Sequence, residues 1–167
     1  YDCTHMADFY MCKYSYRYTS EIIYALEWMP SLSSEKNLKV LSFGCGPCTD
    51  LFAIDYLRVS GKLCYQILDY RGVDYSRDVW NNDIKSFDNN QIRISFHYRD
   101  MCEVIDNISQ GRWRPNLIVF QYVFSDMNKH TDHCRIEEFI DKFSSYYNEK
   151  CEAGTYIIIN DINLNNS

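Results

Sequence analysis

Two closely spaced glycines follow a short apolar run and precede a helical pattern. The apolar run contains Leu38, Val40, Leu41 and Phe43, and the glycines are Gly44 and Gly46. Glycine adopts positive φ angles and lets a ligand approach the backbone closely. The first amides of the helix that follows have no partner within that helix. The segment therefore predicts a buried strand, a tight turn and a helix start that together can bind a ligand.

An acidic residue closes the next apolar run. We expect a strand over Tyr70–Asp74, with Asp74 at its end. A carboxylate in that position can accept two hydrogen bonds from a ribose diol. Taken alone, the glycines fit an ordinary turn and Asp74 fits a helix cap. Their conjunction favours a site for a nucleoside-containing ligand.

The glycine segment also carries a competing motif. Cys45-Gly-Pro-Cys48 has the spacing of a thioredoxin redox site, and a helix start would lower the pKa of the first thiol. Pro115, before an apolar strand, is placed like the cis-proline that faces such sites. Thioredoxins, however, usually carry an aromatic residue where Gly44 stands, and they have no use for an acid like Asp74. A thiol-disulfide oxidoreductase is therefore our second hypothesis.

The cysteines do not form a metal-binding pattern. A four-ligand zinc site usually pairs two short knuckles. Only Cys45 and Cys48 lie close together, and His130 with His133 and Cys134 is a weak second pair, so we predict no metal site. Scattered thiols without a recognisable leader indicate a reducing compartment and a cytoplasmic location. The eight cysteines are Cys3, Cys12, Cys45, Cys48, Cys64, Cys102, Cys134 and Cys151.

Alternating apolar patterns predict an α/β fold. Strands alternating with helices give βαβ units, hence a Rossmann-like, mostly parallel sheet with helices on both faces. We expect an N-terminal helical cap over 1–37 and a cofactor-binding core over 38–167. Besides the two strands above, we expect strands over Ile92–Tyr98, Leu117–Phe124 and Thr155–Asn160. Helical spacing extends over Ala7–Trp28, from Thr49 or Cys48 to Leu57, and over Ile136–Tyr147, and Ser31–Lys36 reads as a polar connector.

Charge and length limit the partners. The 167 residues suffice for one compact domain. The formal net charge of −6 makes a duplex nucleic acid a poor partner, because phosphates require a basic face. No apolar run approaches the roughly 20 residues that span a bilayer. We expect a small-molecule or protein partner and no membrane, and the first residue, Tyr1, suggests a piece of a longer protein.

Four segments resemble the motifs of class I S-adenosylmethionine-dependent methyltransferases, over roughly Leu38–Ile162. Val40-Leu-Ser-Phe-Gly-Cys-Gly-Pro resembles the first motif, and Gly72-Val-Asp-Tyr-Ser resembles the second. Tyr98-Arg-Asp-Met resembles the third, and Asn116–Asp126 resembles the fourth strand with its following loop. The resemblance implies S-adenosylmethionine as the cofactor and methyl transfer to an acceptor by in-line displacement.

The resemblance also implies roles for single residues. The methionine portion of the cofactor would lie along the glycine turn, Gly44, Cys45 and Gly46, and the ribose would bind at the end of the second strand, Asp74 and Tyr75. The adenine would lie between Asp100 and Met101, after the third strand. Gln121 and Tyr122, at the end of the fourth strand, would face the methionine end.

The acceptor side is less defined. Tyr14 and Tyr18 on the N-terminal helix would cover the pocket and contact substrate. Asp126 and His130 are our catalytic candidates, with Asp126 as a base if the acceptor must lose a proton. Methyl transfer itself depends mainly on alignment of donor and acceptor.

Three features depart from the family pattern. Ser42 stands where an acid usually precedes the first glycine, and Cys48 stands where a third glycine is common. The chain also ends after the fifth expected strand, where the family adds a two-strand hairpin. The Ser42 departure leaves room for a third hypothesis, a non-catalytic cofactor-binding scaffold. A nicotinamide-binding Rossmann domain fits less well, because its third glycine is missing.

Overall fold

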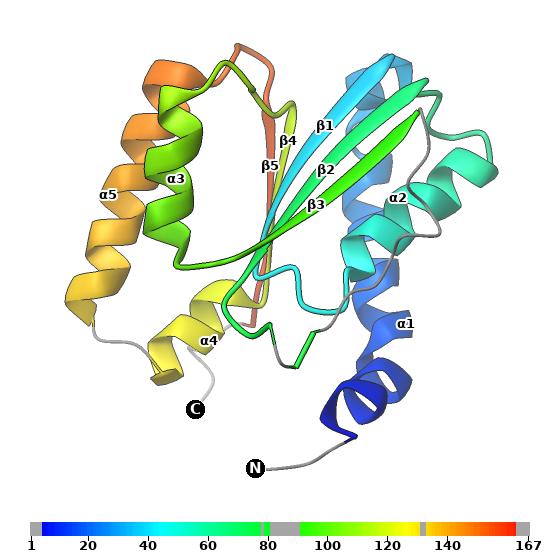
Figure 1. Cartoon of the computed structure of the whole chain (residues 1–167). Coiled ribbons are helices and arrows are strands. Elements are labelled where there is room, and N and C mark those ends of the chain that lie inside the picture. The colour runs from blue at the N-terminus through cyan, green and yellow to red at the C-terminus, as the bar shows by residue number, and fades with distance from the viewer. Residues whose placement is uncertain (1–4, 78, 81–90, 131–132, 163–167) are drawn as a thin grey trace.

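A single parallel sheet forms the centre of the protein. The structure is a computed structural model that describes residues 5–77, 79–80, 91–130 and 133–162. Its five strands lie in the order β3-β2-β1-β4-β5, all parallel (Figure 1). The strands are β1 (Asn37–Phe43), β2 (Ile67–Asp74), β3 (Ile92–Tyr98), β4 (Leu117–Gln121) and β5 (Tyr156–Asn160).

Helices cover both faces of the sheet, which confirms the expected Rossmann-like fold. Helices pack against each face, and α4 lies below the carboxyl ends of the strands in Figure 1. The first face carries α1 (Met6–Glu27) and α2 (Thr49–Val59), and the second carries α3 (Met101–Gln110) and α5 (His133–Lys150). The remaining elements are α4 (Val123–His130) and the 3-10 helix η1 (Pro30–Ser34).

Side-chain alternation along the buried strands produces two hydrophobic cores. Val40 of β1 packs with Ile22 of α1 and Ile54 of α2 on one face. Its neighbour Leu41 belongs to the other core, with Ile105 of α3. Successive strand residues point to opposite faces, so a strand covered by helices on both faces, such as β4 with its buried Leu117–Phe120, is apolar on both sides. Continuous apolar runs in the sequence follow from this arrangement.

The structure corrects the expected elements after the fourth strand. We expected this strand to reach Phe124, but β4 ends at Gln121 and α4 begins at Val123. Tyr122 between them has a φ of +60°, which interrupts the extended backbone. His130 and His133 lie at the end of α4 and the start of α5.

Two further helices differ from expectation. The apolar pattern of α3 was not recognised, although its N-cap is Asp100, whose side chain accepts the Cys102 amide. The polar connector Ser31–Lys36 contains most of η1, which Pro30 opens. Among the described residues, no helix is both long and apolar enough to cross a membrane.

We predict that Gly72→Ala destabilises the fold. A Cβ atom at Gly72 would lie 2.8 Å from both Cys45 Sγ and Phe96 Cδ1, so these two side chains would have to move. Overpacking of this kind costs about 1–3 kcal/mol of unfolding free energy, measurable by urea titration. Gly111→Ala is the matched control, because its nearest contact would be an ordinary 3.6 Å. Equal stability of the two variants would contradict the close packing of β2 on the glycine turn.

Candidate cofactor-binding cleft

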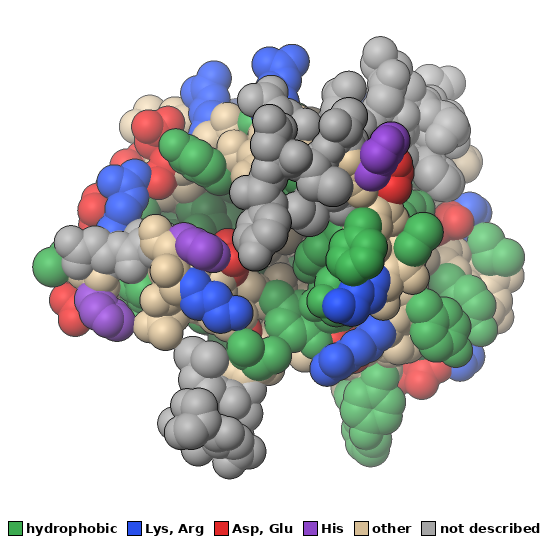
Figure 2. Space-filling view, turned by 90° about the horizontal axis from the view of Figure 1, so that it is seen from below, with side chains coloured by type: hydrophobic (Ala, Val, Ile, Leu, Met, Phe, Trp, Pro, Cys, Tyr) green, Lys and Arg blue, Asp and Glu red, His purple; other side chains and the backbone are tan. Residues whose placement is uncertain are grey.

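A wide cleft opens at the carboxyl edge of the sheet, the edge that Figure 2 views from below. Its volume is about 1340 Å³, which exceeds the roughly 300–1,000 Å³ of common ligand pockets. It is therefore large enough for a nucleoside-containing cofactor and a second molecule. The predicted site residues that line it are Tyr18, Gly44, Cys45, Gly46, Asp74, Tyr75, Asp100, Met101, Gln121, Tyr122, Asp126 and His130.

Hydrogen bonds tie the glycine turn to the end of β2. Gly44 and Gly46 have φ angles of +62° and +44°, a conformation that glycine adopts without strain. The Gly46 amide donates to Asp74 Oδ2 at 2.9 Å, and the Ser76 amide donates to Asp74 Oδ1 at 2.9 Å. Two amides thus fix the carboxylate, and each of its oxygens keeps a lone pair for another donor.

The two cysteines of the turn are buried rather than reactive. Cys45 and Cys48 are 5% and 0% exposed. Contact with the Cys48 thiol, together with burial, raises the pKa of Cys45 well above its ordinary value. A redox-active first cysteine requires the opposite shift. This environment disfavours the oxidoreductase hypothesis, and within the described ranges no three potential metal ligands gather.

The Ser42 side chain lies in the protein interior and not in the cleft. It is 2% exposed and hydrogen-bonds the carboxylate of Asp50, which lies in the first turn of α2. The Tyr70 hydroxyl also donates to Asp50 at 2.9 Å. Burial raises the pKa of Asp50 even though these donors oppose the shift. The family's acid at the end of the first strand therefore has no equivalent in this cleft at position 42.

Asp100 is already engaged where the resemblance expects an adenine contact. Its Oδ1 accepts the Cys102 amide at 2.9 Å, and its Oδ2 pairs with Arg135 of α5. Burial alone would raise the pKa of Asp100, but the hydrogen bonds from Arg135 and the Cys102 amide, together with the charge of Arg135, outweigh it and the pKa falls. Met101 lines the cleft beside it. An adenine amino group would have to share this carboxylate with Arg135.

Aromatic rings form one wall of the cleft. Tyr10 contacts Trp80, with ring centroids 5.2 Å apart, and Tyr18 contacts Tyr122 at 4.2 Å. Tyr14 lies against Tyr10 and Tyr18, at 4.9 and 5.3 Å, but does not itself line the cleft. The structure therefore places Tyr18 where the sequence predicted and gives Tyr14 a supporting position.

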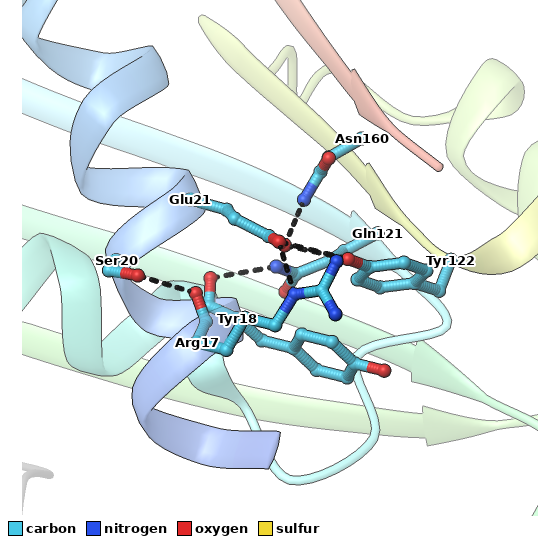
Figure 3. A network of polar contacts seen from close by, with 7 residues as sticks. All are labelled: Arg17, Tyr18, Ser20, Glu21, Gln121, Tyr122 and Asn160. Atoms are coloured by element: carbon cyan, nitrogen blue, oxygen red, sulfur yellow. Dashed lines mark hydrogen bonds and ion pairs between the residues drawn. The ribbon is translucent and has the colours of Figure 1, made fainter. Parts of the chain in front are cut away.

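A network of hydrogen bonds centred on Glu21, called the clamp below, holds α1 over the carboxyl ends of β4 and β5 (Figure 3). The Glu21 carboxylate accepts hydrogen bonds from Arg17 Nε at 2.8 Å, the Tyr122 hydroxyl at 2.8 Å and Asn160 Nδ2 at 2.7 Å. Partial burial alone would raise the pKa of Glu21, but these three donors together lower it. Charge-assisted bonds of this kind are stronger than neutral ones, so Glu21 fixes α1 against the sheet.

The two residues at the end of β4 are held in defined orientations. Gln121 Oε1 accepts from the Thr49 hydroxyl at 2.7 Å, and its Nε2 donates to the Tyr18 carbonyl at 2.8 Å. The Tyr122 amide donates to the Asn160 carbonyl at 2.7 Å. Burial, followed by the bond to Glu21, raises the pKa of Tyr122 to about 12. Both side chains therefore have a fixed orientation in the wall of the cleft.

The catalytic candidates lie on the exposed side of the cleft. Asp126 and His130 occupy consecutive turns of α4, with Asp126 Oδ1 and His130 Nε2 3.7 Å apart. Their side chains are 76% and 71% exposed. They can meet an acceptor that enters from solvent.

Several cleft and clamp residues were missed by the sequence interpretation. The i,i+4 spacing of Arg17 and Glu21 is a visible helix pair, but spacing alone does not show that it faces the sheet. Trp80, Arg135 and Asn160 come from segments far apart in the chain and carry no local signal. Only the fold brings them to one edge.

A comparison with solved structures supports this architecture. The crystal structure of DesVI from Streptomyces venezuelae matches 94% of the chain with a TM-score of 0.57 and 20% sequence identity. DesVI is an S-adenosylmethionine-dependent methyltransferase, and the likeness confirms the Rossmann-like α/β fold that the sequence predicted. The match covers 57% of the DesVI chain, so this sequence spans little more than half of that protein's length. No family model and no curated protein sequence matches the chain.

We predict that Glu21→Gln lowers stability at neutral pH and that the loss fades in acid. Because the folded-state pKa of Glu21 lies below 4.5, its contribution is complete above that pH and disappears as pH falls through the folded pKa. Weakening its charged hydrogen bonds should cost about 1–3 kcal/mol. Urea titrations at pH 7, 5 and 3.5 measure this, with exposed Glu35→Gln as the control. A deficit that stays constant down to pH 3.5 would contradict the clamp.

Proposed function

We propose that this chain binds S-adenosylmethionine in the cleft and transfers its methyl group to an acceptor. The observation that carries the proposal is one hydrogen bond on the wall of the cleft. The Gly46 amide, in the glycine turn after β1, donates to the carboxylate of Asp74 at the end of β2. The cleft also lies where ligands bind in parallel sheets, beyond the carboxyl ends at the switch in strand order. The DesVI fold supports the same assignment.

The cleft residues fit such a cofactor. Asp74, fixed by two amides, would accept the ribose hydroxyls, and Gly44 and Gly46, which line the cleft, would lie along the methionine portion. Gln121 and Tyr122 would border the methionine end. When bound, the cofactor supplies an electrophilic methyl group on a positively charged sulfur. Rings of Tyr18 and Tyr122 would shield that charge from water.

The acceptor would enter beside α4. Asp126 and His130 would take up a proton released by the acceptor, either directly or through water. Because both side chains are exposed, this side of the cleft accommodates a small molecule or a side chain of another protein. The net charge of −6 favours these acceptors over nucleic acid.

We predict that Asp74→Asn weakens binding of S-adenosylhomocysteine, the demethylated cofactor. Removing the charge from the ribose acceptor should cost about 1–3 kcal/mol of binding free energy, measured by isothermal titration calorimetry. Asp106→Asn is the control, since Asp106 pairs with Lys142 between α3 and α5 and does not line the cleft. Absence of binding to the wild-type chain would reject the proposed function. Unchanged affinity in Asp74→Asn would remove Asp74 from the site.

We also predict that the cysteine pair is inert in the folded protein. In native buffer a thiol reagent should modify exposed Cys12 and Cys64 quickly, while Cys45 and Cys48 react only after unfolding in urea. Peptide mapping by mass spectrometry measures each site. Cys102, which is buried outside the motif, is the internal control. Modification of Cys45 as fast as Cys12, or a Cys45–Cys48 disulfide that forms and is reduced in the folded chain, would restore the oxidoreductase hypothesis.

A further inference from the structure

The outer side of α1 carries aromatic rings where a surface helix usually carries charges. Ile22 and Leu26, 0% and 3% exposed, belong to the hydrophobic core on the inner side of the helix. On the opposite side, residues at intervals of three or four form a single row, because a helix turns once in about 3.6 residues. We call this row the outer stripe. Its six members are all exposed: Phe9, Lys13, Tyr16, Ser20, Tyr24 and Glu27.

The rings of the outer stripe are well exposed and lie along one line of the helix. Phe9 is 58% exposed, Tyr16 is 89% exposed and Tyr24 is 64% exposed. Trp28, which is 71% exposed, adjoins the stripe, since its ring centroid lies 6.1 Å from that of Tyr24. Single exposed apolar side chains are ordinary, but a group of them marks a surface that binds another molecule. The outer stripe is therefore a candidate interface.

The order of residues along the outer stripe is symmetric about Ser20. Tyr16 and Tyr24 lie four residues before and after this serine, and the oppositely charged Lys13 and Glu27 lie seven residues before and after it. A two-fold axis through Ser20 would place a second copy of α1 antiparallel to the first. Tyr16 would then face Tyr24 of the second copy, and Lys13 would face Glu27. A parallel pair would bring like charges together, so charge complementarity selects the antiparallel one.

The existing contacts of the outer stripe are compatible with this pairing. The Ser20 hydroxyl donates to the Arg17 carbonyl at 2.7 Å, so it requires no acceptor across the axis. Its small side chain lets two helices approach closely at the point where they cross. Glu27 pairs with Lys62 of its own chain, and its carboxylate keeps lone pairs for a second cation. Pairing through Ser20 therefore leaves these contacts in place.

The apolar area of this surface approaches what a stable dimer requires. A buried aromatic side chain contributes about 150–250 Å², so the exposed parts of Phe9, Tyr16, Tyr24 and Trp28 amount to about 500 Å² per protomer. A stable interface of standard size buries about 800 Å² on each partner. Further apolar area comes from α2, which packs alongside α1 on the same side of the sheet (Figure 1) and exposes Tyr56 and Val59.

We propose that this chain forms a homodimer through the outer stripe, in which the two α1 helices pack antiparallel and cross at Ser20. The inference does not rest on the proposed function. The inner side of the same helix lines the cleft and is held by the clamp. In the dimer α1 would therefore be fixed from both sides.

The first test is the mass of the protein in solution. In sedimentation velocity at micromolar concentration, wild type should sediment with twice the chain mass of 19.9 kDa. Tyr16→Glu should raise the dissociation constant of the dimer by about tenfold or more, because an unpaired charge would be buried against a ring. Ile140→Glu is the matched control, since Ile140 is 45% exposed on α5, across the sheet. Circular dichroism shows whether each variant keeps its helices.

The second test is a cross-link that only the proposed axis allows. Two copies of Ser20→Cys would face each other, so mild oxidation should join the chains by a disulfide, seen on a non-reducing gel. Cys12 lies eight residues before Ser20, so its two copies would lie about 24 Å apart along the antiparallel helices. A disulfide spans Cα atoms no more than about 7 Å apart. Wild type, whose Cys12, Cys64 and Cys134 are exposed, should therefore stay uncross-linked.

Each result decides the proposal. A wild-type chain that stays monomeric up to millimolar concentration would overturn it, and the outer stripe would then belong to a different partner. A dimer that withstands Tyr16→Glu and is not cross-linked through Ser20→Cys would use another surface, which overturns it as well. Cross-linking of wild type through Cys12 would contradict the antiparallel register. If Tyr16→Glu loses its helices, the Ser20→Cys cross-link decides, because that substitution adds no bulk or charge.

Discussion

The parallel pairing of β1 with both of its neighbours is the constraint on which the site depends. β1 pairs with β2 on one side and with β4 on the other, and all three run in the same direction. The chain therefore leaves β1 toward α2 on one face, while β4 leads into α4 at the carboxyl edge. These diverging connections cannot fill the space between them, and a crevice results. The glycine turn, Asp74 and the end of β4 surround it because of their positions along the sheet, whatever the ligand is.

Two residues at the carboxyl edge of the sheet have a strained backbone, and for one of them the hydrogen bonds of the clamp stabilise this conformation. Cys48 and Tyr122 are the non-glycine residues with positive φ in the described chain, and both adjoin the cleft. Such conformations cost about 1–3 kcal/mol each and persist where surrounding contacts determine them. At Tyr122 those contacts are the Asn160 carbonyl and the Glu21 carboxylate. The clamp that fixes the position of α1 thus also stabilises the turn from β4 into α4. The shape of the cleft therefore depends on the position of α1.

The fold and the cleft residues at the strand ends could be predicted from the sequence because their signals are local. β3 occupies Ile92–Tyr98 as expected, and the glycine turn precedes α2 as expected, since apolar runs and glycines act within a few residues. The end of β4 was misplaced because Tyr122 owes its conformation to Asn160 and Glu21, which are distant in sequence. α3 was overlooked when Asp100 was assigned to a ligand, although it also caps that helix. Arg17 and Trp80 became visible only when the fold brought them to the cleft.

The central claim is that the carboxyl edge of the sheet is the cofactor site, and amide chemical shifts test it most directly. A chain of 19.9 kDa gives resolvable ¹H–¹⁵N spectra, in which each backbone amide reports its own surroundings. On titration with S-adenosylhomocysteine, the amides of Gly44, Gly46, Ser76 and Tyr122 should shift in saturable fashion. Those of Asn37 and Ile67, at the opposite ends of the strands, should not. Saturable shifts confined to other surfaces, or an unchanged spectrum at millimolar ligand, would contradict the account.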